Sequence, residues 1–124
     1  MPRVSILLTC YNHLAYLPAA VESIRAQTFH DFEVIAIDDG STDVSREWLA
    51  SQPNITLVLN EKNLGTYGTL NKGLDLATGE FIAVLNDDDV WMPEKLANGG
   101  GATTPADLII SRELLWMAPV GGAG

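Results

Sequence analysis

The sequence predicts an α/β domain in which a mostly parallel sheet is flanked by helices. Apolar runs of strand length alternate with segments whose apolar residues recur every three or four positions, the period of an amphipathic helix. The resulting order, β-α-β-α-β-α-β, is typical of parallel strands joined by right-handed crossovers. In such sheets, ligands bind beyond the carboxyl ends of the strands, near the point where the strand order reverses.

Two strands and two helices are expected in the first half of the chain. Residues 4–9 form the first strand and residues 15–27 an amphipathic helix. The apolar face of that helix consists of Leu17, Ala20, Val21 and Ile24. Residues 32–37 form the second strand, and a hydroxyl at positions 41–42 is expected to cap the helix that follows.

The second half adds a third helix and more strands. Residues 55–59 form the third strand and residues 80–85 the fourth. The helix between them is expected to end at Gly79, with an apolar face made by Leu70, Leu74 and Ala77. Residues 107–111 are a candidate fifth strand, and the rest of residues 97–124 is expected to be irregular. If the strand order is 3-2-1-4, the point of reversal lies between the first and the fourth strand.

Acidic residues follow two of these strands and mark the candidate site. Residues 87–89 are all aspartate, and residues 38–39 are a second acidic pair. Adjacent carboxylates repel one another, and a divalent cation relieves that repulsion. In the expected strand order, both acidic groups and residues 9–12 share one crevice. The alternative is a solvated acidic turn before a short helix at Pro93.

Composition narrows the class of protein. The 124 residues suffice for one domain, and a net charge of −9 without any basic cluster argues against nucleic acid as a partner. No apolar run approaches the ~20 residues of a membrane-spanning helix, and no signal peptide is recognisable. A cytoplasmic location is therefore expected, with peripheral membrane association as an alternative. Cys10 is expected to be a small buried residue, and His13 and His30 to be surface or capping residues.

Three stretches together carry a family resemblance. VSILLTCYN, DFEVIAIDDGSTD and NLGTYGTLNKGLDLATGEFIAVLNDDDVWMPEKL resemble, in order and spacing, the nucleotide-binding half of family 2 glycosyltransferases with the GT-A fold. The resemblance covers residues 3–96. It implies that residues 1–124 form one nucleotide-sugar-binding GT-A domain that lacks the family's downstream acceptor-binding half.

The resemblance also implies roles for individual residues. Nucleotide contacts are expected from Thr9, Tyr11, Asp39 and Asp87, and a Mn²⁺ or Mg²⁺ site from Asp88 and Asp89. An anionic acceptor at Asp39 suits a uracil N–H, and the Tyr11 ring can stack on the base. Asn86 stands where many members have an acid, and Leu70 stands where the family usually has an arginine.

By this resemblance the function is metal-dependent, inverting transfer of a sugar from a nucleotide diphosphate to a saccharide or other hydroxyl acceptor. UDP is the expected nucleotide, and no residue of the chain is assigned as the catalytic base. A non-catalytic nucleotide- and metal-binding fragment is one alternative. A receiver-like phosphoacceptor domain is another, although its acidic pair would follow the first strand, where this chain has residues 10–12. An uncovered half-sheet would also favour self-association.

Overall fold

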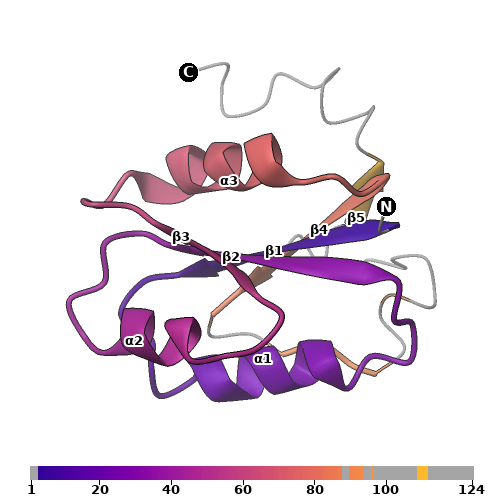
Figure 1. The fold of residues 1–124 in the computed structure, drawn as a ribbon, viewed down its shortest axis with the longest axis horizontal. Helices are drawn as coiled ribbons and strands as arrows, with labels where there is room; N and C mark the ends of the chain where they lie inside the picture. Colours follow the sequence, from indigo (N-terminus) through magenta and orange to yellow (C-terminus); the bar gives the residue numbers. More distant parts are fainter. Residues whose placement is uncertain (1–2, 88–89, 94–95, 97–108, 112–124) are drawn as a thin grey trace.

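A computed structural model describes residues 3–87, 90–93, 96 and 109–111. Within these residues the chain forms one five-stranded sheet in the order β3-β2-β1-β4-β5, which is the order 3-2-1-4 considered above with β5 added beside β4 (Figure 1). The first four strands are parallel, and the fifth runs antiparallel to β4. The strands are β1 (Val4–Cys10), β2 (Phe32–Asp38), β3 (Thr56–Leu59), β4 (Phe81–Asn86) and β5 (Ile109–Ser111).

Helices cover both faces of the sheet, as expected for parallel strands joined by crossovers. The helices are α1 (Leu17–Arg25), α2 (Ser45–Ala50) and α3 (Gly65–Leu76). Helices α1 and α2 lie on one face and α3 on the other (Figure 1). In the described residues, no helix is long and apolar enough to cross a membrane.

The alternation of side chains along β1 divides the core into two layers. Ile6, Leu8 and Cys10 are buried in the layer that includes the apolar face of α1. Leu7 lies in the opposite layer, with Ile37 of β2 and the partly buried side chains of α3. Because β1 is buried on both faces at the centre of the sheet, its carboxyl end is held firmly between those of its neighbours.

Strand register brings three strand ends together. Thr9 is aligned with Asn86 of β4, and Cys10 with Asp38 of β2. Backbone hydrogen bonds continue this alignment past the strands, since the Asp87 amide donates to the Thr9 carbonyl at 3.0 Å. The predicted crevice between the ends of β1, β2 and β4 is therefore present.

The segment after the acidic loop is fastened to the end of α1 by Gln27, whose side chain is buried. Its amide nitrogen donates to the Met92 carbonyl at 2.7 Å, and its amide oxygen accepts from the Leu96 backbone at 3.0 Å. The Thr28 amide adds a bond of 2.9 Å to the Pro93 carbonyl. The chain is thus fixed on both sides of the acidic loop.

Two sequence predictions about helix ends are wrong. Helix α2 has no hydroxyl cap; instead, Asp43 accepts a hydrogen bond of 2.9 Å from the Ser45 amide at its first residue. Helix α3 ends at Leu76, three residues before Gly79. The chain turns away there because the Thr78 amide donates to the Glu33 carboxylate at 2.8 Å. The helix expected at Pro93 and most of residues 97–124 fall outside the described residues.

Candidate functional site

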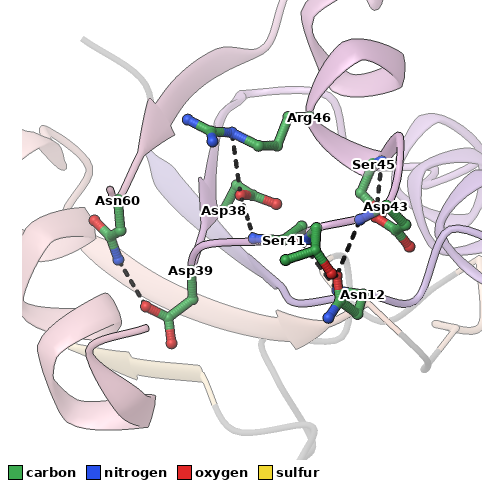
Figure 2. A network of polar contacts seen from close by, with 9 residues as sticks. Asn12, Asp38, Asp39, Ser41, Asp43, Ser45, Arg46 and Asn60 are labelled. Atoms are coloured by element: carbon green, nitrogen blue, oxygen red, sulfur yellow. Dashed lines mark hydrogen bonds and ion pairs between the residues drawn. The ribbon is translucent and has the colours of Figure 1, made fainter. Parts of the chain in front are cut away.

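Asp39 follows β2 and is held by donors from the end of β3 and the start of α3. Its Oδ1 accepts from Asn60 Nδ2 at 2.9 Å (Figure 2). Oδ1 also accepts from the Leu64 amide at 2.7 Å, and Oδ2 accepts from the Gly65 amide at 3.0 Å. A carboxylate offers about four acceptor directions. Three are used by these bonds, and the Thr69 hydroxyl is a further donor to Asp39.

The same hydrogen bonds keep Asp39 ionised. Burial acts to raise the pKa of this carboxyl, but donors from Leu64, Asn60, Thr69 and Gly65 outweigh burial and hold its pKa below the ordinary value. The residue is only 7% exposed. Asp39 is therefore a fixed anionic acceptor at neutral pH.

Asp38, the neighbouring acid, has a different task. Its side chain is completely buried, and its Oδ2 accepts from the Ser41 amide at 3.0 Å and lies 3.5 Å from Arg46 Nε (Figure 2). These contacts hold the turn after β2 against the start of α2. Of the two adjacent acids, Asp38 shapes the turn and Asp39 lines the cavity.

Asn12 ties the loop after β1 to the loop after β2. Its backbone is left-handed, with φ of 52°, a conformation that asparagine tolerates better than most residues. Its side-chain oxygen accepts from the Thr42 backbone amide at 2.7 Å, and its backbone amide donates to Ser41 Oγ at 3.0 Å. Ser41 is thereby engaged between the loops, which explains why it does not cap α2.

Asp87 closes the other side of the crevice. Its side chain is 7% exposed; Oδ2 accepts from the Tyr11 amide at 2.7 Å, and Oδ1 lies 2.8 Å from His13 Nδ1. Each oxygen keeps one acceptor direction for a ligand. The prediction for His13 is incomplete: its ring is partly exposed, but it also contacts the site.

A cavity of about 290 Å³ lies between these loops. It is lined by eight residues: Thr9, Cys10, Tyr11, His13, Asp39, Thr69, Asn86 and Asp87. The structure therefore brings together all four residues predicted to contact a nucleotide. Thr9 Oγ1 donates to Asn86 Oδ1 at 2.8 Å, and Tyr11 is 43% exposed at the rim.

The predicted metal ligands, Asp88 and Asp89, lie outside the described residues. Among the residues that are described, no group of three or more His, Cys, Asp or Glu side chains is arranged to hold a metal ion. Asp87 directly precedes these two acids and is fixed at the cavity. The metal site stays a prediction from the sequence.

Cys10 is buried, as predicted, although it borders the cavity. Burial raises the pKa of its thiol, and the negative charges of Asp87 and Asp38 raise that pKa further. The thiol is therefore protonated at neutral pH, and Cys10 is not a nucleophile.

Gly40 allows the Asp39 loop to press against the loop after β3. Its φ is +84°, and an added Cβ would lie 2.9 Å from the Asn63 amide nitrogen. Gly65 has a φ of +81°, but open space surrounds it.

We expect Gly65→Ala to lower the free energy of unfolding by about 1 kcal/mol through backbone strain, and Gly40→Ala to lower it by about 3 kcal/mol through strain and overpacking. Urea unfolding of both variants measures the difference, and equal losses would contradict the close contact at Gly40.

Comparison with known sequences identifies the relatives of this chain. A profile of the family described as glycosyl transferase family 2 matches residues 5–99. An uncharacterized glycosyltransferase from Nostoc is 40% identical over 98 residues, which cover 76% of this chain and 30% of the relative. A PGL/p-HBAD biosynthesis glycosyltransferase from Mycobacterium bovis is 35% identical over 117 residues, 87% of this chain and 45% of the relative.

Solved structures of glycosyltransferases also align with this chain. A mannosyltransferase from Pyrobaculum calidifontis, in complex with GDP-Man and Mn²⁺, aligns with a TM-score of 0.70 and 30% identity, covering 78% of this chain and 31% of that one. Residues 1–349 of Staphylococcus aureus TarS, in complex with UDP-GlcNAc, align with a TM-score of 0.71 and 29% identity, covering 78% and 30%. The chain thus spans less than half the length of each of these four proteins.

Proposed function

The chain belongs to glycosyltransferase family 2, and on that premise we propose that it binds the nucleotide-sugar donor of a sugar transfer to a hydroxyl acceptor. It has the GT-A fold of that family. The observation that carries the proposal is the cavity at the ends of β1, β2 and β4, which is lined by the two fixed carboxylates of Asp39 and Asp87. Such acceptors suit the N–H of a base and the hydroxyls of a ribose.

In this proposal, UDP is the nucleotide. Asp39 accepts a hydrogen bond from the uracil N–H, and the exposed ring of Tyr11 stacks on the base. Asp87 accepts from the ribose hydroxyls through its remaining directions. Thr9 completes the contacts at the end of β1. The TarS structure in complex with UDP-GlcNAc supports a uridine donor.

We further propose a Mn²⁺ or Mg²⁺ ion held by Asp88 and Asp89. Their donor set, carboxylate oxygens, is the set both ions prefer, and a chain of net charge −9 needs a cation to accept a diphosphate. When bound, the ion acts as a Lewis acid on the departing diphosphate. The mannosyltransferase structure with GDP-Man and Mn²⁺ supports this assignment.

The proposed transfer proceeds with inversion, through in-line attack of an acceptor hydroxyl on the anomeric carbon. Asp39 is a poor candidate for the base that deprotonates this hydroxyl, because a carboxyl with a lowered pKa is a weak base. Asp87 is engaged by Tyr11 and His13 on the other side of the cavity. We therefore assign the described residues to donor binding, and we leave the acceptor and the base unassigned.

Calorimetry with the purified chain tests the proposal. We expect UDP to bind more tightly than ADP or GDP, and binding to weaken when EDTA replaces Mn²⁺. Incubation with UDP-sugars and hydroxyl acceptors, followed by mass spectrometry, then separates a transferase from a non-catalytic nucleotide-binding fragment. Equal binding of all three nucleotides would contradict the base contact, and the absence of any nucleotide binding would contradict the donor site itself.

A further inference from the structure

His13 lines the cavity but has no role in the proposed function. Its Nδ1 lies 2.8 Å from Asp87 Oδ1. A carboxylate can only accept hydrogen bonds, so the ring nitrogen is the donor in this contact. The Asp87 side chain is buried, whereas the His13 side chain is 45% exposed. The contact therefore joins a buried carboxylate to a ring at the rim of the cavity.

The backbone of His13 is fixed by contacts that do not involve Asp87. Its carbonyl accepts from the Tyr16 amide at 2.9 Å and from the Leu17 amide at 3.0 Å, where α1 begins. The preceding residue, Asn12, is tied to the loop after β2. The His13 ring also packs edge-on against the Tyr16 ring, with 6.0 Å between the centroids. His13 is thus a fixed donor against which the Asp87 carboxylate is oriented.

Two donors from the loop after β1 together set the orientation of the Asp87 carboxylate. The Tyr11 backbone amide donates to Oδ2 at 2.7 Å, and His13 holds Oδ1. The terminal torsion of an aspartate is broad, so a carboxylate held at one oxygen only can still turn. Because the His13 ring is half exposed, its loss should release this rotation without unfolding the chain.

We propose that His13 is a positioning residue for the nucleotide-sugar donor: its ring holds the Asp87 carboxylate in the orientation that accepts from the ribose hydroxyls. This assignment rests on the proposed function and adds a residue to it. Hydrogen bonds weaken steeply when donor and acceptor are misaligned, so a turned carboxylate binds the ribose less well. The effect of His13 is therefore expected to depend on the ribose hydroxyls.

A second way for His13 to act is through positive charge, because no lysine or arginine is among the eight residues that line the cavity. The two mechanisms differ in what they require. An effect of charge needs an imidazolium near the bound diphosphate, whereas orientation of Asp87 needs only an N–H donor at the place of Nδ1. An uncharged side chain that keeps this donor separates them.

Calorimetry with His13→Phe and His13→Asn makes this separation. Phenylalanine keeps an aromatic ring beside Tyr16 and removes the donor. Asparagine carries an uncharged N–H group on the same side-chain carbon that bears Nδ1 in histidine. We expect His13→Phe to weaken UDP binding about tenfold and His13→Asn to stay within about threefold of the parent. Thermal unfolding verifies that both variants are folded, and an equal loss of affinity in both would overturn the assignment.

Two ribose analogues, 2′-deoxy-UDP and 3′-deoxy-UDP, provide the readout that a general disturbance of the cavity would not give. At least one should bind the parent more weakly than UDP does, and His13→Phe should not weaken that analogue further. If His13→Phe weakens UDP and both analogues equally, the assignment is wrong while the proposed function stands. If the parent binds both analogues as tightly as UDP, the ribose contact of Asp87 and this assignment are wrong, although donor binding stands. If the parent does not bind UDP, the proposed function fails and the assignment fails with it.

Discussion

Replacing Asp39 with asparagine is expected to weaken UDP binding by at least about tenfold, or 1.4 kcal/mol. The carboxylate accepts three hydrogen bonds from Asn60, Leu64 and Gly65, and in the proposal it also accepts one from the base. An amide has a single oxygen, which accepts at most two bonds, and its NH₂ group would face donors. The variant must therefore lose the contact to the base or the contacts to the start of α3. Calorimetry with UDP in the presence of Mn²⁺ measures the loss.

Asp43→Asn is the matched control for this variant. Asp43 belongs to the same polar network and accepts from the Ser45 amide at 2.9 Å and the Leu14 amide at 3.4 Å (Figure 2). Burial acts to raise the pKa of Asp43, but hydrogen bonds, chiefly from Ser45, hold it below the ordinary value. Asp43 does not line the cavity. We expect Asp43→Asn to cost stability while leaving UDP affinity unchanged; a similar loss of affinity in both variants would refute the base contact.

The lowered pKa of Asp39 also gives the sign of a pH effect. A carboxyl whose pKa is lower in the folded state adds stability above its unfolded pKa of about 3.9, and that stability is lost as the pH falls through the folded value. Asp39→Asn removes this titration. The stability of the variant should therefore fall less steeply than that of the parent between neutral and acidic pH, as measured by urea unfolding.

Much of the fold follows from short apolar runs in the sequence. The run at residues 81–85 is buried against β1, and the runs in β1 and β2 have no polar face that could have been turned to solvent. The strands and helices depend on patterns within each segment, which the sequence displays directly. Strand order does not, and it is the observed order that makes Asp39 and Asp87 converge at one cavity.

The contacts that complete the site depend on pairs that no local pattern reveals. His13 and Asp87 are separated by 74 positions, so their contact appears only once β1 and β4 are placed side by side. Thr69 has the spacing of an ordinary helical residue, and only the cavity singles it out. The cap expected at positions 41–42 failed for a related reason: Ser41 and Thr42 had a stronger alternative in the distant Asn12.

The second large effect is expected at the acidic loop. With Mn²⁺ present, Asp88→Ala should reduce UDP affinity by about tenfold or more, to the value that the parent shows in EDTA. The physical reason is that a diphosphate approaching an acidic loop needs a cation between the two negative charges. If Asp88 holds that cation, replacing Asp88 and chelating the ion have the same effect on UDP binding. EDTA should therefore have little further effect on the UDP affinity of Asp88→Ala.

Asp87→Ala provides the comparison that separates a metal ligand from a nucleotide contact. Asp87 holds Tyr11 and His13 in place, and its amide is bonded to Thr9, so its side chain shapes the cavity with or without an ion. Its removal should lower UDP affinity in both Mn²⁺ and EDTA, and should also lower the unfolding temperature. The Asp88 assignment is wrong if Asp88→Ala keeps the full response of its UDP affinity to Mn²⁺. The loop is fixed at Asp87 on one side and through Gln27 and Met92 on the other, so a change confined to residue 88 should leave the rest of the cavity intact.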